Sequence, residues 1–73
     1  MSITVYTKPS CPGCTLTKKL LDRNGIPYIQ RDITEDPEAL QRVKELGYLQ
    51  APVVETPTES WSGFRPDKIG ELA

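Results

Sequence analysis

The sequence contains no histidine, and only two of its 73 residues are cysteines. Without histidine, neither a Ser–His nor a Cys–His catalytic arrangement can be built, and imidazole cannot serve as a metal ligand. No stretch reaches the run of about 18 apolar residues that a membrane-spanning helix needs, and the first residues show no secretory signal. We therefore expect a cytoplasmic protein that does not contact a membrane.

Neither sign of charge is in excess. Nine Lys and Arg residues oppose ten Asp and Glu residues, so the net charge is −1, and the basic residues are scattered along the chain. Proteins that bind nucleic acids usually carry a concentrated basic patch. The sequence therefore indicates no nucleic-acid partner, and its length corresponds to one small domain over residues 1–73.

The residue pattern predicts four strands and three helices in the order strand, helix, strand, helix, strand, strand, helix. β-Branched and aromatic residues indicate the strands. Apolar residues at helical spacing, a proline at each helix start and a glycine beyond two helix ends indicate the helices. The expected strands cover residues 3–7, 27–33, 53–55 and 59–62, and the expected helices cover residues 12–23, 37–46 and 66–72.

This order of elements predicts a mixed sheet. A strand–helix–strand unit places its two strands in parallel through a right-handed crossover, whereas the last two strands form an antiparallel hairpin. Helices are expected on both faces, which is an α/β architecture. The apolar residues expected to line the first two helices are Leu16, Leu20 and Leu21, and Ala39, Leu40, Val43 and Leu46.

The two cysteines stand at the junction between the first strand and the first helix, in the sequence Cys11-Pro12-Gly13-Cys14. Residues three apart in a helical turn lie about 5–6 Å apart, which is within reach of a disulfide. Unpaired backbone N–H groups and the helix dipole favour a thiolate on Cys11, and Lys8 adds positive charge. We expect Cys11 to attack a disulfide and Cys14, inside the first turn, to resolve the product.

Other interpretations of this dithiol remain open. A purely structural disulfide is disfavoured by a cytosolic location and by the very short loop that it would close. A zinc ion or an iron–sulfur cluster needs about four ligands, so two copies of the chain would have to share it. Two buried thiols without chemistry are disfavoured by the position at a helix start. No metal cofactor is therefore expected in a single chain.

Two further features leave alternatives open from the residues alone. Pro52, in Ala51-Pro52-Val53, either starts a strand or follows a cis peptide bond opposite the cysteines. The group that accepts the proton of Cys14 is also undecided, and the candidates are Asp22, Asp32 and Glu55.

Several segments together resemble the glutaredoxin and thioredoxin superfamily, namely Tyr6-Thr7-Lys8-Pro9, Cys11-x-x-Cys14 and Ala51-Pro52-Val53. A further likeness is to the NrdH-redoxins. It is carried by Gly47-Tyr48-Leu49-Gln50-Ala51-Pro52-Val53 and by Trp61-Ser62-Gly63-Phe64-Arg65-Pro66-Asp67. The resemblance covers essentially the whole chain.

The resemblance implies a thioredoxin-like, glutaredoxin-type fold, with a four-stranded mixed sheet, three helices and a cis Pro52 that faces the dithiol. It implies a monomeric thiol–disulfide oxidoreductase without a bound cofactor. Thioredoxin reductase would supply its electrons from NADPH, and the large subunit of class Ib ribonucleotide reductase would accept them. The residues expected to contact these partners are Ala51, Pro52, Val53, Trp61, Ser62, Gly63, Phe64 and Arg65.

Two features bear on which reductase the chain uses, and a third concerns the docking surface. Glutaredoxins that hold glutathione tend to carry a Thr-Val-Pro and a Gly-Gly-x-x-Asp stretch. In this chain Gln50-Ala51-Pro52 and Trp61-Ser62-Gly63-Phe64 stand in their places, so we expect no glutathione-binding site. Pro12-Gly13 between the cysteines is instead more glutaredoxin-like, which keeps a glutathione-dependent glutaredoxin as the alternative. Trp61 is expected either in the core or at the docking surface.

Overall fold

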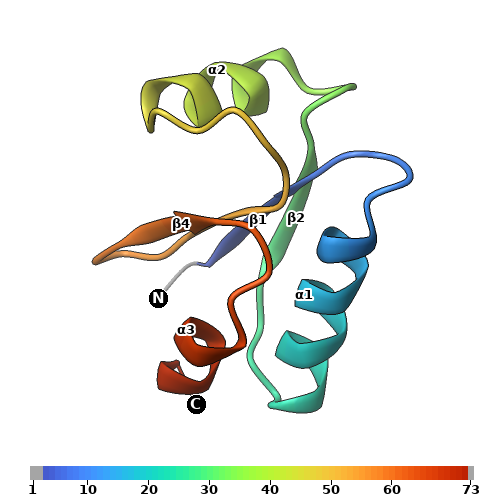
Figure 1. Ribbon diagram of the computed structural model, residues 1–73. Helices are drawn as coiled ribbons and strands as arrows, with labels where there is room; N and C mark the ends of the chain where they lie inside the picture. Colours follow the sequence, from blue (N-terminus) through green and yellow to red (C-terminus); the bar gives the residue numbers. More distant parts are fainter. Residues whose placement is uncertain (1–2, 73) are drawn as a thin grey trace.

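The computed structural model describes residues 3–72 as seven elements in the predicted order (Figure 1). The strands are β1 (Thr4–Thr7), β2 (Ile29–Asp32), β3 (Val53–Glu55) and β4 (Ser60–Ser62). The helices are α1 (Pro12–Arg23), α2 (Pro37–Glu45) and α3 (Pro66–Glu71). Each helix has a proline in its first turn, where a missing N–H breaks no helical hydrogen bond.

The four strands form one mixed sheet in the order β2-β1-β3-β4, which confirms the predicted architecture. β1 runs parallel to β2, and the pairs β1–β3 and β3–β4 are antiparallel. Tyr6 in β1 pairs with Val53 in β3. The end of β1, which leads to the cysteines, therefore lies beside the beginning of β3, which follows Pro52.

The helices cover the two faces of the sheet unequally. Figure 1 shows α1 and α3 together on one face and α2 alone on the other. Because side chains alternate across a strand, Val5 packs in the core beneath α1 and α3, whereas its neighbour Tyr6 packs in the core beneath α2. The larger core contains Ile3, Val5, Leu21, Ile26, Val54, Trp61 and Ile69, and the smaller one contains Tyr6, Ala39, Val43 and Val53.

Two leucines do not lie where their spacing predicted. The buried residues of α1 are Cys14, Thr17 and Leu21, a stripe spaced by three and four residues that faces the sheet. Leu16 lies about 200° around the helix from Cys14 and is 47% exposed. Leu40 is also exposed, at 37%, because Ala39 and Val43 form the inner face of α2. The expectation that Leu40 is buried was wrong.

The second strand is shorter than expected, since Pro27 and Tyr28 precede it. These two residues belong to the connection that follows α1. That helix ends at Arg23 and is capped by Asn24. Gly25 follows with a left-handed φ of +69°, and the Ile26 N–H donates to the Leu21 carbonyl at 2.9 Å. This is the glycine stop predicted from Asn24-Gly25, with Ile26 buried beyond it. None of the helices within residues 3–72 is long and apolar enough to cross a membrane.

Candidate redox site

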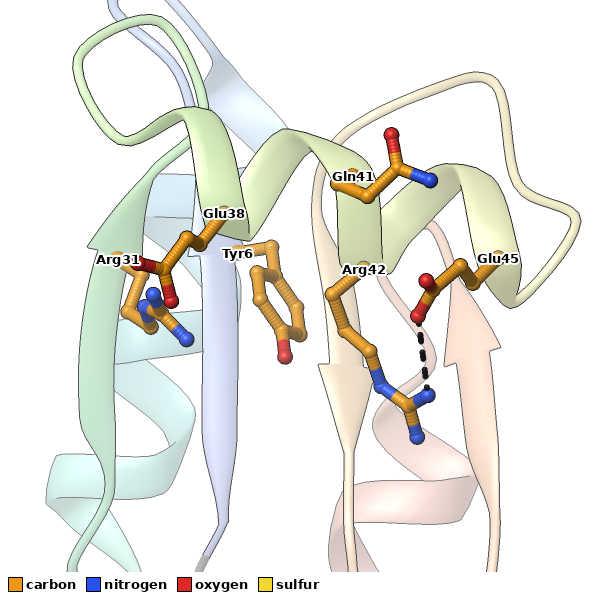
Figure 2. A pocket seen from close by; sticks show the side chains of 6 residues that line it. All are labelled: Tyr6, Arg31, Glu38, Gln41, Arg42 and Glu45. Carbon is orange, nitrogen blue, oxygen red and sulfur yellow. Dashed lines mark ion pairs between the residues drawn. The ribbon is translucent and has the colours of Figure 1, made fainter.

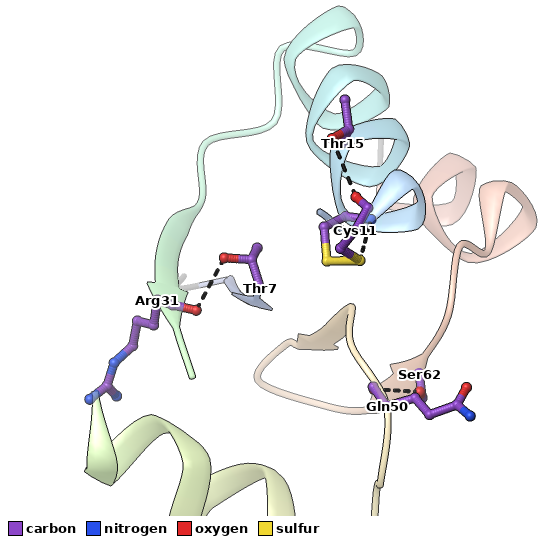
Figure 3. Close-up of a disulfide and its surroundings, with 7 residues drawn as sticks. Thr7, Cys11, Thr15, Arg31, Gln50 and Ser62 are labelled. Carbon is purple, nitrogen blue, oxygen red and sulfur yellow. Dashed lines mark hydrogen bonds between the residues drawn. A yellow bond between two sulfur atoms is a disulfide. The ribbon is translucent and has the colours of Figure 1, made fainter. Parts of the chain in front are cut away.

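Cys11 and Cys14 form a disulfide at the start of α1, with their Cα atoms 5.2 Å apart (Figure 3). Cys11 is the N-cap of the helix in an extended conformation, and its sulfur accepts a hydrogen bond of 3.1 Å from the Cys14 N–H. The Cys11 sulfur therefore lies at the start of α1, where the first backbone N–H groups lack helical partners and the helix dipole is positive.

The two cysteines differ in exposure. Cys11 is partly exposed, whereas Cys14 is only 2% exposed and begins the buried stripe of α1. The first turn of α1 contains no acidic residue that would oppose a negative charge on Cys11. Lys8, the expected source of positive charge, is exposed on the segment between β1 and the helix. An incoming molecule can therefore reach Cys11 more easily than Cys14.

Pro52 lies against the first turn of α1. The Ala51–Pro52 peptide bond is cis, as the resemblance implies. A methyl group built onto Gly13 would lie 3.2 Å from the Pro52 Cδ and 4.0 Å from the Phe64 Cβ. Gly13 thus permits a close approach between the loop that contains the disulfide, the Pro52 ring and Phe64.

The end of β4 holds the Pro52 loop in place. The Gly63 N–H donates to the Pro52 carbonyl at 2.8 Å, and the Ser62 hydroxyl donates to the Gln50 carbonyl at 3.0 Å (Figure 3). Gly63 has a φ of +88°, a left-handed conformation that glycine adopts without steric penalty. Ser62 and Gly63 therefore position the loop through direct hydrogen bonds.

The other residues expected to contact partners lie in three environments. Val53 is fully buried in β3 between β1 and β4, and Ala51 is half-buried. Phe64 is 37% exposed. Arg65 is exposed and pairs with Asp67 at 2.9 Å at the start of α3, without a side-chain capping bond.

Trp61 is 4% exposed and packs in the core beneath α1 and α3. Its position on β4 turns the ring toward those helices. Of the two expectations for this residue, the structure favours the core, and the interpretation of the Trp61 side chain as a docking contact is corrected.

A mostly apolar groove lies between α1 and Phe64. It has a volume of about 240 Å³ and is lined by Leu16, Lys19, Leu20, Arg23 and Phe64. Within residues 3–72, neither Lys19 nor Arg23 forms an ion pair. The groove therefore combines exposed apolar side chains with unneutralised positive charge.

A second cavity, of about 430 Å³, lies between the sheet and α2 (Figure 2). Tyr6 donates a hydrogen bond of 2.8 Å to the Glu55 carboxylate, which also pairs with Arg42. The Arg42 guanidinium, followed by the Tyr6 hydroxyl, holds the pKa of Glu55 below its usual range, and burial raises the pKa of Tyr6. Glu55 pairs with Thr4, so it lies at the far end of the strands from Pro52.

The same geometry bears on the candidates for the proton acceptor of Cys14. Asp22 is exposed. Asp32 accepts hydrogen bonds from Thr34, which lower its pKa. Together with the distant Glu55, these carboxylates provide no buried acid beneath the disulfide.

Comparison with known proteins places this site in a family. The family model described as "Glutaredoxin" matches residues 3–61. The chain is 39% identical over 72 residues to the glutaredoxin-like protein NrdH of Escherichia coli, and it covers 89% of that protein. It is 38% identical over 71 residues to the NrdH of Lactococcus lactis and covers 99% of it. The chain belongs to the NrdH-redoxins of the glutaredoxin family.

The fold agrees with this membership. The structure of the Escherichia coli NrdH-redoxin superposes with a TM-score of 0.95 at 38% identity, covering 100% of this chain and 96% of that one. That protein is described as having a thioredoxin-like activity profile. The thioredoxin-like fold implied by the resemblance and the redox-active disulfide predicted from Cys11-Pro12-Gly13-Cys14 are confirmed, and the chain is a thiol–disulfide oxidoreductase.

Sequence reasoning missed part of the surface around the site. Leu16 was expected on the apolar face of its helix, whereas it lines the groove. Leu49, three residues before Pro52, is 96% exposed and was given no role. An isolated leucine in a loop gives no signal by itself, and its exposure follows only from the path of the chain toward Pro52.

Proposed function

We propose that this chain is a cytoplasmic dithiol electron carrier, reduced by thioredoxin reductase with electrons from NADPH. Its proposed acceptor is the active-site disulfide in the large subunit of class Ib ribonucleotide reductase. The observation that carries the proposal is the Cys11–Cys14 disulfide at the start of α1, with the Cys11 sulfur as the N-cap. Similarity to NrdH proteins over 99% of the chain supports the choice of partners.

The exchange takes place in two steps. The Cys11 thiolate attacks one sulfur of the partner disulfide, and the other partner sulfur leaves as a thiolate that takes up a proton. The Cys14 thiol then loses its proton, and its sulfur attacks Cys11 within the mixed disulfide. The Cys11–Cys14 bond forms, the second partner sulfur leaves, and the partner has gained two electrons and two protons. Thioredoxin reductase returns the dithiol by the reverse exchange.

The structure supports this division of roles. Partial exposure and a position at the positive end of the helix suit Cys11 as the attacking thiolate. Lys8, Pro12 and Gly13 complete its immediate environment, Lys8 as a nearby positive charge and the other two as the turn between the sulfurs. Burial suits Cys14 as the resolving thiol, because a partner cannot reach it directly.

The proposed docking surface surrounds Cys11. The backbone of Ala51 would pair with an extended partner segment, in a loop positioned by Ser62 and Gly63. The Pro52 carbonyl already accepts from Gly63, and Val53 pairs with β1 and β4. The side chains of Phe64 and Leu16 would supply apolar contact. The unneutralised Lys19 and Arg23 favour a partner segment that combines apolar and acidic residues. Arg65 lies at the edge of this surface.

The chain is proposed to act as a monomeric domain over residues 1–73 without a bound cofactor. Two alternatives remain for the test. Pro12-Gly13 would suit a glutathione-dependent glutaredoxin, and two chains could share a four-cysteine metal cluster. A coloured or metal-containing dimer from purification would identify the cluster-binding protein instead.

The decisive experiment follows NADPH oxidation in the presence of a protein disulfide substrate. One reaction contains this chain and thioredoxin reductase, and the other contains this chain, glutathione and glutathione reductase. We expect turnover with thioredoxin reductase alone, and a class Ib ribonucleotide reductase should then turn over with the same components. Turnover only with glutathione would make the chain a small glutaredoxin and refute the proposed partners.

A further inference from the structure

The buried stripe of α1 contains one polar side chain that the redox chemistry described above does not use. Cys14, Thr17 and Leu21 face the sheet with exposed fractions of 2%, 0% and 0%. The Thr17 hydroxyl oxygen is buried and has no hydrogen-bond partner. Buried hydroxyls are rarely left unpaired, because their loss of water is then uncompensated.

Another threonine of the same helix shows that the unpaired Thr17 hydroxyl is unusual. The Thr15 hydroxyl, on the exposed side of α1, donates to the Cys11 carbonyl four residues earlier at 3.3 Å. This is the ordinary local bond of a helical threonine. Thr17 makes no such bond, so its hydroxyl is free to interact with another group.

Cys14 lies one helical turn before Thr17 on the same buried face, and in the oxidised protein its sulfur makes no hydrogen bond with that hydroxyl. Residues three apart on a helix have Cβ atoms about 5–6 Å apart, and helical side chains tilt toward the N-terminus. The Thr17 side chain therefore leans toward Cys14. In the oxidised protein the Cys14 sulfur is bonded to Cys11, and only its release creates a thiol or thiolate that needs a partner.

In the resolving step, a negative charge forms on the buried Cys14 sulfur. A thiolate on a residue that is 2% exposed lacks water, which disfavours its charged form. Within residues 3–72, the buried polar side chains are Thr7, Thr17 and Thr56. Thr7 donates to the Arg31 carbonyl at 3.5 Å and Thr56 to the Glu59 carbonyl at 3.0 Å. In this part of the chain, Thr17 is thus the buried hydroxyl without a partner, and the indole N–H of Trp61 on β4 is the other buried polar group without one.

We propose that Thr17 is a positioning residue for Cys14, whose hydroxyl donates a hydrogen bond to the Cys14 sulfur once the disulfide is open. This bond stabilises the thiolate and holds it toward Cys11. The Cys14 proton passes to solvent, its sulfur forms a new bond with Cys11, and the sulfur bonded to Cys11 leaves as a thiolate. The inference rests on the proposed roles of the two cysteines, and it is independent of the reductase and of the protein substrate.

The test uses the reduced full-length chain and one equivalent of 5,5′-dithiobis(2-nitrobenzoate), with stopped-flow detection of the released aromatic thiolate. The first release reports the attack by Cys11, and the second reports the resolution by Cys14. Both rates are measured as a function of pH for the wild-type chain and for Thr17→Val, which keeps the shape and removes the hydroxyl. Thr17→Ser restores the hydroxyl, and Thr15→Val is the matched control on the exposed face.

We expect Thr17→Val to slow the second release about tenfold at neutral pH and to move its pH profile upward by about one unit. The first release should be unchanged, Thr17→Ser should retain most of the wild-type rate, and Thr15→Val should match the wild type. Thr17→Ala, as a second variant without the hydroxyl, should repeat the effect of Thr17→Val if the latter folds poorly.

Two results would overturn the inference. One is a second release in Thr17→Val with the wild-type rate and pH profile. The other is an equal slowing of both releases together with a lower urea midpoint, which would indicate a purely structural role. The absence of a second release in the wild-type chain would refute the proposed roles of the two cysteines. That outcome differs from a failure of the Thr17 inference, in which the wild type releases the second thiolate and Thr17→Val does so equally fast.

Discussion

At the scale of single residues, Cys11 combines two roles in one atom. Its sulfur caps α1 by accepting the Cys14 N–H, and it is also the accessible half of the disulfide. The residues between the cysteines suit this arrangement, since Pro12 needs no N–H partner in the first turn and Gly13 leaves room for the Pro52 ring. A β-carbon at position 13 would require the Pro52 ring to shift by a few tenths of an ångström.

Glu55 provides a residue-scale prediction about pH. Because Arg42 and Tyr6 hold the folded-state pKa of Glu55 below the unfolded value of about 4.3, this carboxylate stabilises the fold above that pH. The contribution is lost as the pH falls through the lowered folded-state pKa. We expect Glu55→Gln to lower the urea midpoint at pH 7 and to make its further decrease toward pH 3 smaller than in the wild type.

The exposed Glu71 provides the control for this measurement, because among residues 3–72 its side chain forms no hydrogen bond or ion pair. Glu71→Gln should leave the midpoint at pH 7 close to that of the wild type. Identical acid dependence in Glu55→Gln and the wild type would contradict the assigned role of the Tyr6–Glu55–Arg42 contacts.

At the scale of elements, the local signals in the sequence were sufficient to predict the order and most boundaries. The Asp36 side chain caps α2 by accepting the Glu38 and Ala39 N–H groups. This cap, the prolines at the helix starts and the glycine after α1 act on residues nearby in the chain, so the sequence alone indicates them. The orientation of α1 was less predictable. Leu16 has the same apolar character as Leu21, and only the small residues Cys14 and Thr17 on the inner face decide which side packs against the sheet.

The end of α1 gives an element-scale prediction. Gly25 has a φ of +69° and open space around it, so a methyl group meets no atom but the backbone becomes strained. We expect Gly25→Ala to lower the free energy of unfolding by about 1–2 kcal/mol. Urea unfolding followed by far-ultraviolet circular dichroism measures this change.

Gly70 is the matched control, because it also has open space but lies in α3 without a left-handed φ. Gly70→Ala should raise the free energy of unfolding by up to about 1 kcal/mol, since alanine favours the helix. A destabilisation of equal size in both variants would show that the conformation of Gly25 is not the cause.

At the scale of the whole molecule, the site is assembled from segments that are distant in the sequence. The end of β1, the start of α1, the loop before β3 and the segment after β4 meet because β1 and β3 pair in antiparallel register. Local sequence patterns do not indicate which strands pair or in which register. The placement of Pro52 opposite Gly13 was available from the family resemblance, whereas the groove beside Leu16 and the exposure of Leu49 required the three-dimensional fold.

A substitution of Leu49 tests how far the docking surface extends. Leu49 is 96% exposed near Pro52, whereas Ile29, 56% exposed, pairs with Thr4 at the opposite end of the sheet from the cysteines. We expect Leu49→Ser to raise the KM for the reductase about threefold to tenfold, since an exposed apolar contact at an interface contributes about 1 kcal/mol. The rate with a small disulfide should not change.

Ile29→Ser is the control for this substitution and should leave both rates unchanged. Both variants should unfold within about 0.5 kcal/mol of the wild type, because neither side chain is buried. An unchanged KM in Leu49→Ser would exclude this loop from the docking surface.

The most direct test of the account is to trap the mixed disulfide with the two single-cysteine variants. Each reduced variant is incubated with a protein disulfide substrate, and intact mass spectrometry without reductant identifies the covalent complex. Cys14→Ser should accumulate the complex through Cys11, because the attacking sulfur is present and the resolving one is absent. Cys11→Ser should form little complex, since Cys14 is buried. Accumulation of the complex by Cys11→Ser, or turnover of Cys14→Ser at the wild-type rate, would contradict the roles assigned to the two sulfurs.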